Sequence, residues 1–188
     1  MVCLLMAGLS AVCVARSVWA QEAATAPSQE ATQALQLLQS ADPYQRKLGF
    51  LRLEALREPA TVPAIRQYVE SPDADMRADS LRALAAIDGE ASIPLLLEKL
   101  RSDRRPSVRW SALLGLEPLT KHHPELILPF IDALRDYSSE VRMAAVDVVS
   151  RLDDPRARAA VRDRFRRELR PDVRRVLHAA MRRIGTAP

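Results

Sequence analysis

The sequence predicts an all-α protein, an α-solenoid built from stacked helix pairs. Three observations support this fold class: an arginine recurs at nearly constant spacing, apolar residues between these arginines follow helical spacing, and signals for strands are few. Aromatic residues make up 4 % of the chain, and β-branched runs bounded by turn signals are missing. The hydrophobic fraction of 48 % is typical of a chain that buries a core, so we do not expect general disorder.

The N-terminal segment differs from the rest of the chain. Residues 2–15 form an uncharged apolar run, and Val18-Trp19-Ala20 fits a signal-peptidase site, although no Lys or Arg precedes the run. The run is shorter than the ~20 residues of a membrane span. We therefore expect a signal peptide over residues 1–20, a flexible lead-in over residues 21–28, and a folded domain over residues 29–188. The expected location is the periplasm, and an uncleaved membrane anchor is the alternative.

Both cysteines, Cys3 and Cys13, lie in this first segment. A mature chain that begins after residue 20 has no cysteine, so we expect neither disulfide bonds nor thiolate chemistry. A lipid-modified Cys13 is a minor alternative, because the residues before it lack the leucine and small-residue pattern of such sites. After cleavage, the chain is expected to have no transmembrane span.

The remainder of the chain repeats with a period near 32 residues. In each period an arginine follows a mostly apolar residue, which itself follows an Asp, Ser or Pro turn. The recurring arginines are Arg46, Arg77, Arg109, Arg142 and Arg174, with steps of 31, 32, 33 and 32 residues. Such regular self-similarity is the sequence signature of a solenoid.

The first helix of each period is predicted from a stripe of apolar residues that begins just before the arginine. In the fourth period the stripe is Val141, Ala144, Ala145, Val148, Val149 and Leu152, at the spacing of one helix face. In the third period Gly115 stands in a middle position of this stripe, and small residues there allow neighbouring helices to approach closely. Gly89 and Gly185 follow first helices, where left-handed C-caps are common.

The second helix of each period is predicted to start at a capping residue followed by proline. The expected starts are Thr61 with Pro63, Ser92 with Pro94, Pro124, and Asp154 with Pro155. Helices of ten to fifteen residues are marginal alone, because nucleation is unfavourable. Stacking against neighbouring units must therefore supply the stability.

These motifs resemble a known repeat family. The run from Asp136 to Val146, an acidic turn followed by Val-Arg and small residues, resembles the HEAT-repeat signature, and the run from Ser71 to Ala78 is similar. The resemblance covers roughly residues 42–185 and implies about four and a half helix pairs, with an N-terminal capping helix over residues 29–40. The first unit departs from the pattern, because Gln45 stands where an apolar residue is expected.

The resemblance also implies a role for the recurring arginines. In HEAT repeats this arginine usually pairs with an acidic turn residue of the same or the adjoining unit. We therefore interpret Arg46, Arg77, Arg109, Arg142 and Arg174 as an internal ladder rather than a binding site. The acids expected to pair with them are Asp42, Asp75, Asp103, Asp136 and Asp172.

Motifs that would mark an enzyme are missing from the sequence. It contains no Gly-rich phosphate loop, no Gly-x-Ser-x-Gly elbow and no His-Glu-x-x-His. His122 and His123 precede a predicted helix start, where a neutral imidazole can cap the helix, and a metal site would need further ligands at helical spacing. We therefore expect no catalytic residue, no bound cofactor and no metal ion.

Charge is distributed unevenly along the chain. Residues 21–155 carry a net charge of −5, whereas residues 156–188 carry +8. In the basic end, every fourth residue is an arginine, so these side chains should share one helix face: Arg158, Arg162, Arg166 and Arg170. The apolar stripe expected beside them is Ala157, Val161, Phe165 and Leu169.

Like charges four residues apart destabilise a helix by ~0.2–0.5 kcal/mol per pair, so the arginine face has a cost. Our hypothesis is that it recognises an anionic partner, because guanidinium groups bind carboxylates and phosphates. The alternative is a solvated face at the end of the stack, since this protein uses 25 Arg against 3 Lys. Trp110, at a mostly outward-facing position, is a second candidate for partner binding, and burial under a loop is its alternative.

The leading function predicted from the sequence is a non-catalytic, exported scaffold. The resemblance implies that the second helices line a concave face, through which the scaffold would bind a protein partner, and the arginines favour an acidic one. Nucleic-acid binding through the basic end is one alternative, although an export signal argues against it. A HEAT-like lyase, as in HEAT-like proteins that attach bilin chromophores, is the other alternative.

Overall fold

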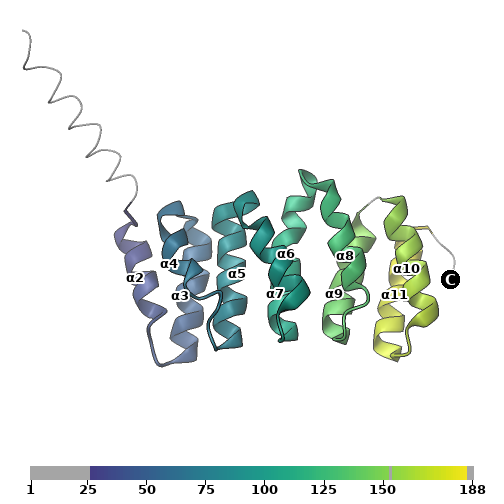
Figure 1. Cartoon of the computed structure of the whole chain (residues 1–188), viewed down its shortest axis with the longest axis horizontal. Coiled ribbons are helices and arrows are strands. Elements are labelled where there is room, and N and C mark those ends of the chain that lie inside the picture. Colours follow the sequence, from purple (N-terminus) through teal and green to yellow (C-terminus); the bar gives the residue numbers. More distant parts are fainter. Residues whose placement is uncertain (1–25, 153, 186–188) are drawn as a thin grey trace, which may run out of the picture.

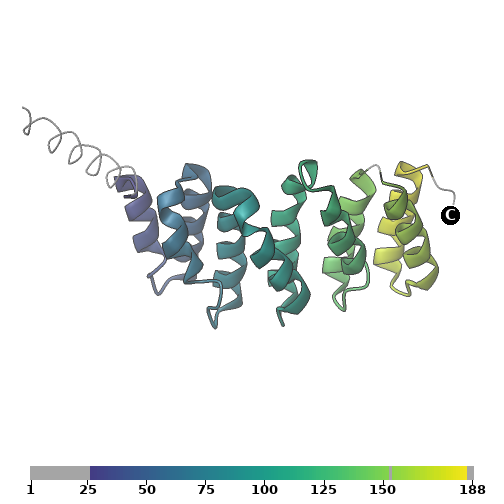
Figure 2. The ribbon, with the colours of Figure 1, turned by 45° about the horizontal axis from the view of Figure 1, so that its top comes forward.

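The computed structural model describes residues 26–152 and 154–185, and this part of the chain is helical, without strands. Figure 1 shows the helices standing side by side in a single row that follows the sequence from α2 to α11. Figure 2 shows the same row from a second direction. The expected signal peptide and most of the lead-in lie outside the described residues. No helix in the described ranges combines the length and the hydropathy that a membrane span needs.

Within the described residues the row consists of helix pairs, as the fold prediction required. The first helices are α3 (Pro43–Leu56), α5 (Ala74–Asp88), α7 (Pro106–Leu116), α9 (Ser139–Arg151) and α11 (Pro171–Arg183). The second helices are α4 (Val62–Arg66), α6 (Ile93–Ser102), α8 (Ile127–Ala133) and α10 (Pro155–Arg167). The helix α2 (Gln29–Leu37) packs against α3 and caps the row, while α11 is the half pair at the other end. The predicted solenoid is therefore confirmed.

The starts of the first helices follow from local capping. Asp42, Asp73 and Ser138 each accept a hydrogen bond from the backbone N–H two residues further on, at 2.9, 2.9 and 3.2 Å. A side-chain oxygen at this position satisfies one of the donors that the first helical turn leaves unpaired. Short polar residues thus mark where α3, α5 and α9 begin, whereas α7 and α11 begin without a side-chain cap.

Two second helices, α4 and α6, begin where predicted, directly after Thr61 and Ser92, but the expected side-chain capping is wrong. Thr61 and Ser92 do not cap; each hydroxyl instead donates to the carbonyl three residues earlier, at 2.7 and 2.6 Å. The physical reason is that short 3₁₀ turns precede these helices, η1 (Pro59–Thr61) and η2 (Gly89–Ser92), so the chain enters the α-helix already in helical conformation. Asp154 does cap α10, accepting from the N–H of Arg156 at 2.8 Å.

The core runs along the row in two clusters of buried residues. The smaller one joins α2, α3 and α5 through residues that include Phe50, Leu53 and Leu84, and the larger one extends from Ala78 in α5 to Met181 in α11. Each first helix packs against the next first helix along the chain. Since burying one such Leu or Phe contributes about 1.5–3 kcal/mol, these lateral contacts are what stabilise the short helices.

Gly115 illustrates how closely the first helices approach. A Cβ atom at this position would lie 2.9 Å from the Cβ atom of Ala85, which is closer than van der Waals contact allows. The glycine in the middle of the predicted stripe therefore permits α7 to pack directly on α5.

Candidate functional site

The recurring arginines form a ladder that ties each turn to the next. Four of them reach a carboxylate of the following unit: Arg46 to Asp73 at 3.0 Å, Arg77 to Asp103 at 2.9 Å, Arg109 to Asp136 at 2.7 Å, and Arg142 to Glu168 at 2.9 Å. Each of these guanidinium groups also donates to the backbone carbonyl six residues before it. The arginines therefore link consecutive units internally, as the resemblance implied.

For three of the five acids expected to pair with the ladder arginines, the prediction is wrong. Asp42 caps α3, the side chain of Asp75 is exposed, and Asp172 pairs with Arg170 at 3.0 Å. The reason is geometric: each arginine reaches forward by 26 or 27 residues, to the acid at the start of the next turn. Only Asp103 and Asp136 of the expected set stand there.

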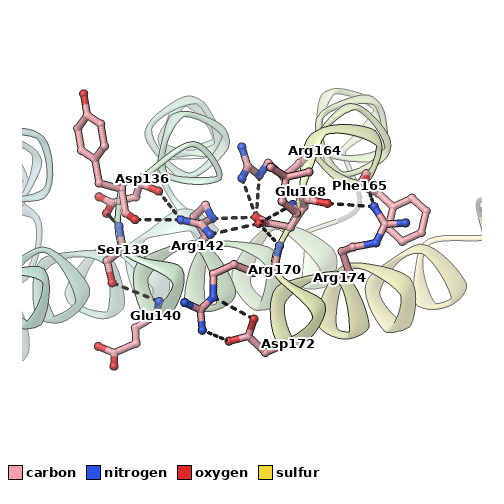
Figure 3. Close-up of polar contacts among 12 residues, drawn as sticks. Asp136, Ser138, Glu140, Arg142, Arg164, Phe165, Glu168, Arg170, Asp172 and Arg174 are labelled. Atoms are coloured by element: carbon pink, nitrogen blue, oxygen red, sulfur yellow. Dashed lines mark hydrogen bonds and ion pairs between the residues drawn. The ribbon is translucent and has the colours of Figure 1, made fainter.

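Glu168 is the ladder acid that sequence reasoning missed. Figure 3 shows its carboxylate between Arg142 of α9 and Arg164 of α10, and it also accepts from the backbone N–H groups of Leu169 and Arg170, both at 3.0 Å. Burial alone raises the pKa of Glu168, but the backbone hydrogen bond from Arg170 and the two guanidinium groups outweigh it, so the pKa falls to about 2. The carboxylate is ionised at neutral pH.

The burial of Glu168 corrects the apolar stripe expected on α10. Leu169, assigned to the buried face, is 90 % exposed, whereas Glu168 is 3 % exposed. The helix ends at Arg167, so helical spacing no longer applies to the two residues that follow. Ala157 and Val161, which lie within the helix, are fully buried as expected.

Arg174, the last recurring arginine of the described residues, has no carboxylate partner among them. Its guanidinium carbon lies 4.5 Å from the centre of the Phe165 ring, and its Nη1 donates to the carbonyls of Phe165 and Glu168, both at 3.0 Å (Figure 3). A cation–π contact thus replaces the ion pair where the array stops.

The predicted arginine face on α10 contains three of its four members. Arg158, Arg162 and Arg166 lie on the helix and are exposed. Arg170 lies beyond the end of α10, at the N-cap position of α11, so it is not part of this face. Arg162 and Arg166 make no ion pair with any described residue, while their neighbours are paired: Arg167 with Asp163 of the same helix, and Arg164 with Glu168 just beyond its end.

Trp110 lies on α7 and is 39 % exposed, rather than buried under a loop. It lines a groove of about 500 Å³ that crosses α5 and reaches α3, where Tyr44 is 72 % exposed. The floor includes Asp79, whose pKa is raised, chiefly because it is buried. Arg82, Lys47 and Asp75 also line the groove, so its walls carry both signs of charge.

His123 lies beside two carboxylates instead of forming the expected helix cap. Its Nδ1 atom lies 2.8 Å from an oxygen of Glu125, and its Nε2 atom lies 3.5 Å from Glu90, while it makes no side-chain capping hydrogen bond. The hydrogen bond to Glu125 and the nearby charge of Glu90 raise the pKa of His123. In the described part of the chain, no group of three metal-ligating side chains comes together.

A second groove, which sequence reasoning missed, lies where α6 and α8 end. It has a volume of about 490 Å³, and Arg101, Arg104 and Arg135 line it together with Tyr137. In the sequence these arginines lie next to the ladder acids Asp103 and Asp136. Aligning the two turns by the repeat period would have indicated that the three arginines lie close together.

Comparison with known proteins supports the repeat assignment. The sequence matches the family model of HEAT repeats over residues 31–117 and again over residues 93–182. Among solved structures, the chain is similar to one from the complex of CpcE and CpcF of phycocyanin lyase from Nostoc sp. PCC7120, at 20 % identity and a TM-score of 0.67. The match covers 80 % of this chain and 97 % of that chain. No curated protein sequence matches this chain.

This comparison corrects the leading functional prediction. A non-catalytic scaffold without enzymatic activity is contradicted, because the matched solved structure belongs to a lyase and supports the lyase alternative better. The motif search considered one chain alone, whereas the matched structure is a complex of two proteins. The two family matches together span most of the array described above, and the chain belongs to the HEAT-repeat family.

Proposed function

We propose that this protein is a HEAT-repeat subunit of a lyase that works together with a second protein subunit. The observation that carries the proposal is the match to a phycocyanin lyase subunit over 97 % of that subunit's length. The correspondence therefore extends over a whole protein of that lyase, not over an isolated pair of repeats. The proposed substrate class is a chromophore-carrying protein, after the phycocyanin in the name of the matched enzyme.

The α10 arginine face, defined as Arg158, Arg162 and Arg166, is the proposed docking surface for the second subunit. Two of its guanidinium groups, those of Arg162 and Arg166, have no acidic partner in the described residues. Each can bind a carboxylate at two points, so an acidic surface on the partner would complement this face. Trp110, partly exposed on α7, is the proposed apolar anchor of the same assembly.

The experiment has two stages. In-cell crosslinking with mass spectrometry first identifies the second subunit, and the two purified proteins are then mixed with apo-phycocyanin and free bilin. We expect the fraction of covalently attached chromophore, read as fluorescence of the denatured protein band, to rise only when both proteins are present. If neither attachment nor release of chromophore changes with any combination, the lyase proposal is wrong.

The docking surface is tested by reversing its charge. We expect the double variant Arg162→Glu/Arg166→Glu to weaken the complex at least tenfold, measured by calorimetric titration. The matched control is Arg175→Glu/Arg182→Glu on α11. It makes the same change of charge elsewhere in the basic end, at two exposed arginines that have no acidic partner among the described residues. Equal weakening by both variants would mean that net charge, and not the α10 face, governs assembly.

A further inference from the structure

The groove at the ends of α6 and α8 combines apolar walls with a cationic rim. Leu100, Pro129 and Ala133 form apolar parts of the lining. Arg101, Arg104 and Arg135 are all exposed at the rim, and the side chain of Tyr137 is fully exposed beside them. At about 490 Å³ the groove has the size of a small-molecule site.

The negative groups in the lining are already engaged. The carboxylate of Asp103 binds Arg77 at 2.9 and 3.0 Å, and that of Asp136 binds Arg109 at two points, both 2.7 Å. Burial raises the pKa of Asp103, but the hydrogen bonds from Arg77 and from the backbone of Arg105, together with the nearby positive charges, outweigh burial, so the pKa is lowered. These carboxylates therefore do not compete for the rim arginines.

Carbonyl groups of the turns that follow α6 and α8 are engaged too. Carbonyl oxygens of Asp103, Asp136 and Tyr137 accept from the ladder guanidinium groups of Arg109 and Arg142, at 2.8, 2.8 and 3.1 Å. Helix C-termini ordinarily repel anions, because their free carbonyls carry a partial negative charge. The ladder guanidinium groups lie beside the turns that follow these helix ends, and their positive charge opposes this effect.

The balance of charge at the rim favours an anion. Arg101 and Arg104 have no ion-pair partner among the described residues, and Arg135 approaches Asp163 only at 3.8 Å. Asp132 is the one lining carboxylate outside the ladder. Among the lining residues of this groove, three guanidinium groups thus stand against one carboxylate outside the ladder, although Arg104 also borders a neighbouring hollow that Asp73 and Asp75 line.

The neighbouring turn shows that these cations are not a general property of the repeat. At the corresponding edge one unit earlier, the chain carries Glu70, Asp73 and Asp75, and Lys99 of α6 pairs with Glu70. Lys99 and Arg101 both lie in the last turn of α6, where a cation stabilises the helix end. Arg104 and Arg135 lie beyond the helices, so helix stabilisation does not explain them.

We propose that this groove binds a small polyanion through its carboxylate or phosphate groups. Guanidinium groups of the rim would hold the anionic oxygens at two points each, and the ring of Tyr137 offers a flat face for an unsaturated part of the ligand. The proposal concerns the isolated chain and does not depend on the lyase function.

The test is a titration of the isotopically labelled full chain with citrate and, separately, with pyrophosphate, followed by amide chemical shifts. We expect saturable shifts at residues 101–105 and 134–138 with at least one of the two, and the one that binds assigns the ligand to carboxylates or phosphates. Arg101→Gln/Arg104→Gln should weaken that binding at least tenfold. The control Arg175→Gln/Arg182→Gln removes the same charge on α11 and should leave it unchanged.

Two outcomes would overturn the proposal. One is the absence of saturable shifts with both anions, and the other is equal weakening by the two double variants, which indicates general attraction to a basic protein. Thermal unfolding of each variant shows whether it is folded. The single variants Arg104→Gln and Arg135→Gln, both outside helices, provide the comparison if the double variant is unstable.

Discussion

Ion pairs of the arginine ladder differ between the middle of the row and its N-terminal end. We call Arg77–Asp103 and Arg109–Asp136 the inner rungs and Arg46–Asp73 the outer rung. Arg77 with Asp103 and Arg109 with Asp136 are joined at two points, and their side chains are 6–11 % exposed. Arg46 meets Asp73 at one point, with side chains 20 % and 39 % exposed. The motif recurs, but the energy of each rung depends on whether its neighbours exclude water.

The difference is traceable to the residue six positions before each ladder arginine. This position holds Asp103, Asp136 and Glu168 in the later units, and these acids receive the arginine of the preceding unit. In the second unit the position holds Ser71, so Arg46 must use Asp73, which also caps α5. When the acid stands two residues later in the turn, the ion pair has one contact instead of two, and its side chains are more exposed.

Breaking an inner rung should have the largest effect. Asp136→Ala leaves the guanidinium group of Arg109 buried without its carboxylate, and removing one partner of a buried pair costs about 3–5 kcal/mol. We expect a loss of roughly this size in the free energy of unfolding, measured by urea denaturation. A loss below about 1 kcal/mol would show that the inner rungs behave like surface ion pairs.

The pH dependence of stability should report on Glu168. Its pKa of about 2 in the folded protein lies below the ordinary 4.5, so its contribution is complete above pH 4.5 and is lost as the pH falls towards 2. Between pH 6 and pH 2.5 we expect the stability of the native protein to fall by on the order of 2 kcal/mol more than that of Glu168→Gln. Parallel profiles from acid-dependent urea titrations would contradict this.

Converting the outer rung into an inner one should give the smallest effect. Ser71→Asp places an acid where the later units have theirs, and a second contact to Arg46 should stabilise the protein by about 0.5–1 kcal/mol. Thermal unfolding measures the gain. The matched control is Ser71→Asp in an Arg46→Ala background, where the gain should vanish; an equal gain there would assign it to helix capping or charge.

Much of the fold could be predicted because it depends on local spacing. The period of the arginines, the apolar stripes and the short helices all follow from residues within one unit. The ladder acids could be predicted only in part, since acids stand at several positions of each turn and the pairing crosses to the next unit. Glu168 was missed for a further reason. Helical spacing was extrapolated past the end of α10 at Arg167, and it placed the side chain of Leu169 in the core instead of that of Glu168.

The candidate sites divide in the same way. Arg162 and Arg166 were found from their spacing alone, and the structure places both on the exposed face of α10. Arg101, Arg104 and Arg135 come from two separate turns, about one repeat apart, and line one groove only because α6 and α8 stack side by side. Helical spacing predicts which residues share one face of a helix, whereas a groove between units can be seen only once the packing of the units is known.

The sequence by itself determined the repeat, its helices and the arginines that recur, because these depend on interactions between residues close along the chain. The tertiary structure decided which acid each ladder arginine binds and which of these ion pairs are buried. It also decided which exposed arginines have no acidic partner among the described residues. The physical reason is that short helices acquire buried surroundings only from the next unit. Burial, and with it the pKa of Glu168 and the engagement of Asp103 and Asp136, is therefore a property of the stack.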